Sequence, residues 1–221
     1  YDWYDIIETG RKKLLKQPAQ IEVEDFGAGS AVIKTNKRMV KDIAASSLKS
    51  KKYAQLLYRI VKYYKPETIV ELGTSFGVTT SYLAAGNTRG KVYTVEGSPA
   101  IAEIARKTFE SVDLKNIELT TGDFNDTLSA LLIKLNTVDL AFIDGNHRKE
   151  PTLNYFKQLL SHSTNSSILI FDDIHWSADM EAAWAAIKQH PSVTLTLDLF
   201  FIGLVFINPD FKIPQHFSIR F

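Results

Sequence analysis

The sequence predicts an α/β protein built on a doubly wound, mostly parallel, seven-stranded sheet with an antiparallel last strand. Three observations support this fold class. Apolar runs of strand length alternate with segments of helical periodicity, the middle strands are apolar almost throughout, and no repeat or Pro/Gly/Ser-rich linker interrupts the series. Strands that are apolar on both faces are typical of a parallel sheet covered by helices. We therefore expect an α/β domain over residues 51–221, preceded by a helical extension over residues 1–50.

The expected elements follow one another in a regular order. A helix over residues 51–64 carries apolar residues at spacings of three and four and stops before Pro66. Strands and helices then alternate, and Ser98 with Pro99 forms an N-cap and first-turn pair that opens one helix. The five expected strands are 68–72, 91–95, 117–121, 138–143 and 168–171, and the later helices between them are 99–109, 127–135 and 152–160.

The last part of the chain predicts a further helix and paired strands. Apolar residues between positions 180 and 187 fall on one helical face, and Pro191 ends this helix. Residues 193–201 and 204–207 are expected to form two antiparallel strands joined by a tight turn. Residues 217–221 alternate between apolar and polar side chains, so we expect one more edge strand there.

Composition excludes several classes of protein. The 26 Lys and Arg residues against 25 Asp and Glu give a net charge of +1, which provides no overall field for nucleic acid or anionic membrane. No apolar stretch is long enough to span a bilayer. Because the chain has no cysteine, it has no disulfide, no thiolate nucleophile and no Cys-based metal site, which fits a cytoplasmic protein.

Polar residues gather where the expected strands end. Ligands of open α/β sheets bind outside the carboxyl ends of the strands. The first strand runs into the sequence ELGTSFGVTT at 71–80, whose glycines allow a tight turn before a helix that presents unpaired N–H groups. The second strand ends at Glu96, a carboxylate suited to the two hydroxyls of a ribose. The third ends at residues 122–124, which we expect to bracket a base.

These motifs resemble those of class I S-adenosylmethionine-dependent methyltransferases, and ELGTSFGVTT looks like the glycine loop of the catechol-type O-methyltransferases. The resemblance covers roughly residues 68–207. It implies the Rossmann-like methyltransferase fold, with the first loop facing the methionine part of S-adenosylmethionine, Glu96 holding the ribose and Asp123 holding the adenine amine. The candidate cofactor-binding residues are Glu71, Gly73, Thr74, Ser75, Gly77, Glu96, Gly97, Ser98, Gly122, Asp123, Phe124 and Asp144.

The fourth and fifth strands end in acids and histidines, in FIDGNHR and FDDIHW. In catechol-type relatives an Asp and an Asp-Asn pair at these places hold a divalent metal. The resemblance therefore implies Asp144, Asp172 and Asp173 as ligands of Mg, Mn or Ca, although Asp173 stands where the family has Asn. His147 stands where the family often has a Lys base, and histidine is the side chain whose ordinary pKa lies nearest neutral pH. The candidate catalytic residues are Asp144, His147 and His175.

The predicted function is enzymatic methyl transfer from S-adenosylmethionine to an oxygen of a small molecule, with nitrogen as the less favoured acceptor atom and metal assistance left open. A nucleic-acid substrate is not expected, because residues 144–147 read DGNH where amino-methylating DNA enzymes carry Asn-Pro-Pro-aromatic. No membrane span is expected. The oligomeric state is open, with a homodimer among the alternatives.

Two other functions compete with this one. A nicotinamide-dependent oxidoreductase also uses a glycine loop and a ribose-binding acid, but it usually has the pattern GxGxxG, and Ser75 replaces the second glycine here. A non-catalytic relative, binding cofactor or a partner protein through its N-terminal arm and the basic segment 34–52, is the second alternative. The sequence FGAGS at 26–30 is a candidate lid or substrate loop.

Overall fold

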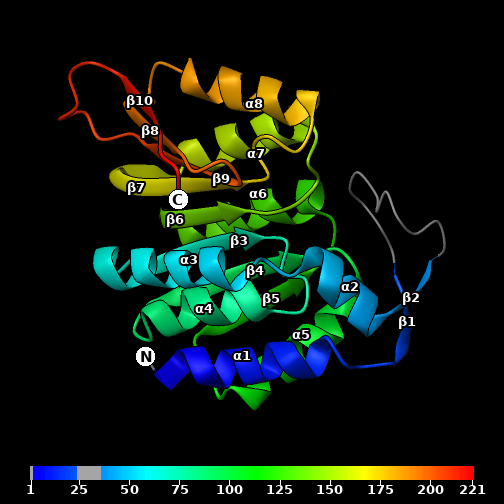
Figure 1. Cartoon of the computed structure of the whole chain (residues 1–221). Helices are drawn as coiled ribbons and strands as arrows, with labels where there is room; N and C mark the ends of the chain where they lie inside the picture. The colour runs from blue at the N-terminus through cyan, green and yellow to red at the C-terminus, as the bar shows by residue number, and fades with distance from the viewer. Residues whose placement is uncertain (1, 24–35) are drawn as a thin grey trace. The chain divides into compact units, whose positions relative to one another are not determined.

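A computed structural model describes residues 2–23 and 36–221 (Figure 1). The candidate lid sequence at 26–30 lies outside the described residues. The chain divides into two compact units: the first comprises Tyr1–Glu67 and Gly73–Phe124, and the second comprises Thr68–Leu72 and Asn125–Phe221.

The predicted α/β class is confirmed. The central sheet is mostly parallel, is flanked by helices, and has the strand order β10-β8-β9-β7-β6-β3-β4-β5. Its strands are β3 Thr68–Leu72, β4 Lys91–Glu96, β5 Ile117–Thr121, β6 Val138–Ile143, β7 Ser163–Asp172, β8 Leu195–Asp198, β9 Ile202–Phe206 and β10 Gln215–Ser218. Within the described residues the sheet has eight strands, one more than the seven of the predicted fold class. The tail forms an edge strand as expected, at Gln215–Ser218, and pairs in parallel with β8.

The first unit contains the N-terminal elements and the parallel strand pair β4 and β5. Its other elements are α1 Asp2–Leu14, β1 Gln20–Glu22, β2 Lys37–Met39, α2 Val40–Ser47, α3 Lys51–Tyr64, α4 Val78–Gly86 and α5 Pro99–Ser111. The N-terminal extension is helical as predicted, and it also holds the antiparallel hairpin of β1 and β2. Helix α5 starts at Pro99, after Ser98, as the sequence predicts.

A buried ionic network fixes α1 to α4 within this unit. Glu8 Oε1 accepts hydrogen bonds from Tyr82 Oη at 2.9 Å and from Arg11 Nε at 3.0 Å. Arg11 Nη1 donates to the carbonyl of Lys49 at 2.7 Å. Burial and the hydrogen bond to Glu8 raise the pKa of Tyr82, so its hydroxyl stays protonated and donates. A carboxylate this deeply buried needs such partners, and the network therefore specifies how α1 docks.

The second unit contains the remaining strands with α6 Phe124–Leu135 at its start, α7 Lys149–Leu160 and α8 Ala178–Lys188. Strands β3, β6 and β7 are parallel, and β9 is antiparallel to both β7 and β8, as predicted for that pair. Helix α8 begins with Ser177, whose hydroxyl accepts from Met180 N, and its predicted apolar face is buried. No described helix is both long enough and apolar enough to cross a membrane.

Candidate active site

The turn that follows β3 is bonded to the end of β4 inside the first unit. The N–H groups of Gly73 and Thr74 donate to the carbonyl of Val95 at 3.0 and 3.3 Å. The hydroxyls of Thr74 and Thr94 lie 2.6 Å apart and are buried. Gly73 has a φ of 100°, a conformation that glycine adopts without strain. The glycine of the sequence motif thus permits the turn that joins this loop to β4.

Glu96 connects three loops of the first unit. Its Oε2 accepts from Ser75 N at 2.9 Å, and its Oε1 accepts from Ser98 N at 3.0 Å. Its backbone carbonyl accepts from Gly122 N at 2.9 Å. The residue is only 9% exposed. These hydrogen bonds hold the Glu96 carboxylate in a fixed position at the carboxyl end of β4, the edge at which α/β sheets bind ligands.

Two buried hydroxyls and an uncommon backbone conformation lie next to the Glu96 carboxylate. Ser75 Oγ and Ser98 Oγ are buried and have no hydrogen-bond partner within residues 2–23 and 36–221. Ser75 also has a φ of 48°, which is uncommon for a residue with a side chain. Unsatisfied buried groups and local strain are typical of ligand sites. The donors and acceptors of these loops therefore fit a nucleoside bearing hydroxyl groups.

The structure brings together most of the predicted cofactor residues of the first unit. The hydrogen bonds above join Gly73, Thr74 and Ser75 to the end of β4, and Gly97 lies between Glu96 and Ser98. Asp123 and Phe124 follow directly after Gly122 and are half-buried. Glu71 and Asp144 lie in the second unit, and Glu71 is fully buried within β3, opposite Phe142 of β6.

We expect any side chain at position 77 to destabilise the protein. It has a φ of 77°, and a Cβ at this position would lie 2.4 Å from Phe109 Cε1. Left-handed strain and overpacking together should make Gly77→Ala about 3 kcal/mol less stable in urea unfolding. The matched control is Gly10→Ala in α1, where a Cβ meets no atom within 4 Å. This control should gain about 0.5 to 1 kcal/mol. Equal effects of the two substitutions would contradict the prediction.

In the second unit, Asp144 and His147 lie next to each other after β6. The backbone N–H of Asp144 donates to the carbonyl of Leu72 at 2.8 Å. His147 Nε2 lies 3.7 Å from Asp144 Oδ1, an ion-pair distance too long for a hydrogen bond. The His147 ring lies 5.7 Å from that of Trp176, measured between centroids. Asn146, in the left-handed conformation, donates to Tyr155 Oη at 3.0 Å and thereby fixes the turn that carries His147.

The predicted metal ligands do not form a metal-binding group. Asp172 ends β7 and is 1% exposed, whereas Asp173 has a φ of 52° and donates its N–H to the carbonyl of Phe201 at 2.7 Å. Among the residues that the structure describes, no three Asp, Glu or His side chains gather in a way that could hold a metal ion. The assignment of Asp144, Asp172 and Asp173 to a divalent cation therefore stays a prediction that this arrangement does not support.

His175, the third predicted catalytic residue, binds carboxylates through both ring nitrogens. Its Nε2 lies 2.8 Å from Asp198 Oδ2, and its Nδ1 lies 3.2 Å from Glu181 Oε1. Partial burial lowers the pKa of His175, but the hydrogen bonds and charges of Asp198 and Glu181 outweigh this effect and raise it above the ordinary value of 6.5. An imidazole donates from both nitrogens only when protonated, so this environment favours the cation.

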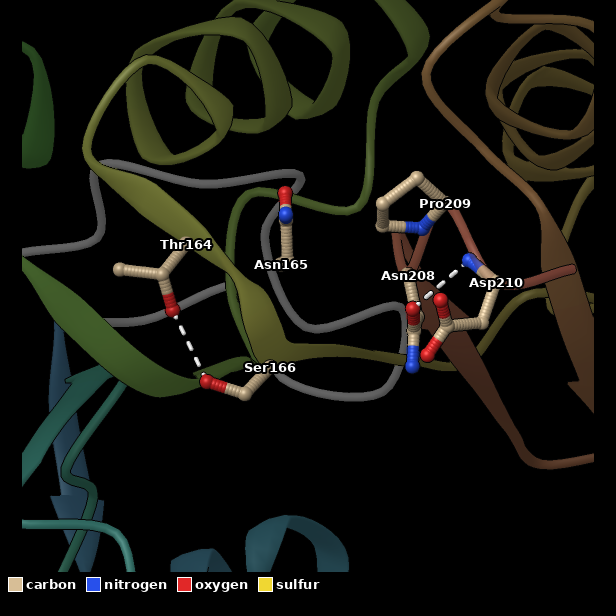
Figure 2. Close-up of a pocket in the computed structure, with 6 residues that line it drawn as sticks. All are labelled: Thr164, Asn165, Ser166, Asn208, Pro209 and Asp210. Atoms are coloured by element: carbon tan, nitrogen blue, oxygen red, sulfur yellow. Dashed lines mark hydrogen bonds between the residues drawn. The ribbon is translucent and has the colours of Figure 1, made fainter.

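One polar hollow of the second unit lies away from the predicted residues. It has a volume of about 430 Å³ (Figure 2), and its lining consists of Thr164, Asn165, Ser166, Asn208, Pro209 and Asp210. Thr164 lies at the start of β7 and Asp172 at its end, about 26 Å apart for eight residue steps of an extended strand. Because α/β sheets bind ligands at the carboxyl ends of their strands, this hollow is not the candidate site.

Comparison with known proteins agrees with the fold. Residues 70–174 match a family model described as a methyltransferase domain, Methyltransf_24. An O-methyltransferase from Bacillus cereus, solved in complex with SAH, superposes with a TM-score of 0.64 at 25% identity, over 76% of this chain and 88% of that one. The chain thus has the fold of class I methyltransferases, and residues 70–174 are similar to a methyltransferase domain.

Two curated relatives match shorter stretches. A tRNA (guanine-N(7)-)-methyltransferase of Mycoplasma mobile is 33% identical over 106 residues, which are 44% of this chain and 53% of that protein. A probable cobalt-precorrin-6B C(15)-methyltransferase (decarboxylating) of Sulfolobus acidocaldarius is 39% identical over 62 residues, 28% of this chain and 31% of that protein. The chain spans about half and about a third of the lengths of these two relatives.

Proposed function

We propose that this protein transfers the methyl group of S-adenosylmethionine to an oxygen atom of a small-molecule acceptor. The observation that carries the proposal is the position of Glu96, a buried carboxylate at the end of β4 that the N–H groups of Ser75 and Ser98 anchor. A carboxylate at this place in an α/β sheet is suited to the hydroxyls of a ribose. The similarity to an O-methyltransferase solved in complex with SAH supports the same ligand.

The first unit supplies the residues that would hold the cofactor. Glu96 accepts from the ribose hydroxyls, and the buried hydroxyls of Ser75 and Ser98 provide further polar contacts. Asp123 accepts from the adenine amine, and Phe124 packs on the base. When bound, the cofactor supplies an electrophilic methyl group on a sulfonium. The protein therefore has to orient the acceptor and remove its proton.

In the second unit, His147 is the proposed base. Its Nε2 faces Asp144 Oδ1 at 3.7 Å, which leaves Nδ1 to take the proton of the acceptor hydroxyl. Bound S-adenosylmethionine would supply the methyl group, and His147 Nδ1 would hold the proton that the acceptor oxygen gives up when it is methylated. The imidazolium is stabilised by the carboxylate of Asp144 and then releases its proton to water.

A labelling experiment tests the proposal. Protein is incubated with methyl-tritiated S-adenosylmethionine and either the small-molecule fraction of a cell extract or bulk tRNA, the second arm being prompted by the 33% identical tRNA methyltransferase. We expect label in the small-molecule arm, and none with the Glu96→Ala variant. Label in tRNA alone would replace the proposed acceptor class. No heat of binding in calorimetry with millimolar S-adenosylmethionine would remove the proposal altogether.

A further inference from the structure

The turn after β7 is joined to the turn between β8 and β9 by one imidazole. His175 Nε2 lies 2.8 Å from Asp198 Oδ2, and the other oxygen of that carboxylate accepts from Phe200 N at 2.9 Å. The rings of His175 and Phe200 stack with centroids 5.6 Å apart and planes 28° apart. The Asp198 side chain is only 15% exposed. We call the contact between His175 and Asp198 the His175–Asp198 bridge.

Two backbone hydrogen bonds extend the same connection. Asp173 N donates to the carbonyl of Phe201 at 2.7 Å, and Trp176 N donates to the carbonyl of Asp173 at 2.9 Å. Trp176 therefore follows a turn whose first residue is fastened to the β8–β9 turn by its backbone. His175, the neighbour of Trp176, is fastened to the same turn by its side chain.

The residue that this turn presents is exposed and lies beside the proposed base. Trp176 is 52% exposed, and its ring centroid lies 5.7 Å from that of His147. An indole with half of its surface in solvent has few contacts of its own to select one rotamer. Its place against His147 consequently depends on how firmly the backbone of residues 173–177 is held.

His175 itself is poorly suited to act as a base. Both of its ring nitrogens face carboxylates, so neither presents a lone pair to an acceptor hydroxyl. We infer that His175 is instead a positioning residue, whose bridge to Asp198 holds residues 173–177 so that Trp176 stays against His147. This inference rests on the proposed function, in which His147 takes the proton.

Two substitutions of His175 distinguish a role in positioning Trp176 from a general role in folding. In glutamine the amide nitrogen is as many bonds from Cα as His175 Nε2, so His175→Gln can keep the bond to Asp198. In asparagine the amide nitrogen matches Nδ1, which faces Glu181, whose side chain is 59% exposed. His175→Asn should therefore lose the bridge while changing the local volume little. His162→Gln, at a histidine bonded to the Gln158 carbonyl at the end of α7, is the matched control.

We expect His175→Asn to lower turnover at least about tenfold, because small displacements of catalytic groups are costly, and His175→Gln to stay within about threefold of the wild type. Turnover is measured with tritiated S-adenosylmethionine and the small-molecule fraction of a cell extract. The affinity for S-adenosylhomocysteine and the turnover of the His162→Gln control should be unchanged, and the melting temperature of His175→Asn should fall by only a few degrees. Equal turnover in the two His175 variants would overturn the inference.

Hydrogen exchange of residues 173–177 gives a readout that needs no acceptor. Exchange should become faster in His175→Asn and remain near wild-type rates in His175→Gln, because only the second keeps the bridge. If the wild type transfers no label, the proposed function fails, and this measurement decides the inference alone. Equal exchange in the two variants would then overturn it, and the expected difference would sustain it.

Discussion

Replacing Glu96 with alanine is expected to weaken S-adenosylhomocysteine binding by at least about 100-fold, measured by titration calorimetry. The substitution removes the acceptor for a ribose and leaves the N–H groups of Ser75 and Ser98 without their partner. Each ribose hydroxyl that donates to the carboxylate contributes about 1.5 to 3 kcal/mol, so losing two such hydrogen bonds costs about 3 kcal/mol or more of binding free energy. A loss of that size corresponds to about two orders of magnitude in Kd.

Two further variants show whether the carboxylate itself is responsible. Glu96→Gln keeps the shape but turns an N–H donor toward either Ser75 N or Ser98 N, so it should also bind poorly and lose about 1 to 3 kcal/mol of stability. Glu118→Gln on the neighbouring strand β5 removes an acid paired with Lys91 at 2.6 Å near the surface, and its affinity should not change. Wild-type affinity in Glu96→Gln would contradict the assignment of the ribose to this carboxylate.

The sequence predicts that Glu96 lies at the end of a strand, but it does not predict which groups form hydrogen bonds with its side chain. A short run of strand-forming residues, VYTV, stops at an acid and locates the end of β4, and the structure ends this strand at the same acid. The partners of the acid are backbone N–H groups, which every residue except proline carries. The identity of residues 75 and 98 therefore does not predict their hydrogen bonds to the Glu96 carboxylate. These bonds depend on the backbone, including the left-handed conformation of Ser75.

The prediction of a strand over 193–201 was too long, for a related reason. Strand β8 ends at Asp198, whose side chain accepts from Phe200 N, and Phe200 has a φ of 71°. A short acid that bonds the backbone two residues later turns the chain. An Asp within an apolar run was thus the available signal for the turn. The contact between Asp198 and His175 spans 23 residues and depends on the pairing of β7, β8 and β9, which local pattern does not encode.

The side-chain directions of the acids at the end of β7 could not be predicted from their motif. Their sequence matches the metal-ligand positions of catechol-type relatives, but the direction of each side chain depends on the strand. Successive residues of a strand point to opposite faces, and Asp172 is still within β7 and buried, while Asp173 has left it in a left-handed conformation. Two adjacent acids therefore need not serve one ion.

Replacing His147 with alanine is expected to lower turnover by about 10² to 10⁴, the usual contribution of a positioned general base. S-adenosylhomocysteine affinity should stay within about twofold of the wild type, because none of the hydrogen bonds that hold Glu96 involves His147. Asp144→Asn should cost less, about tenfold, since its contact with His147 Nε2 at 3.7 Å stabilises the imidazolium without accepting the proton.

Added imidazole distinguishes a missing base from a disturbed site. The space left in His147→Ala lies beside the exposed Trp176 ring, so free imidazole has access and should restore part of the lost turnover in a concentration-dependent manner. His147→Gln fills that space without a group that takes a proton near neutral pH, and it should remain inactive with or without imidazole. Turnover near the wild-type value in His147→Gln would mean that this side chain only fills space and that the acceptor loses its proton elsewhere.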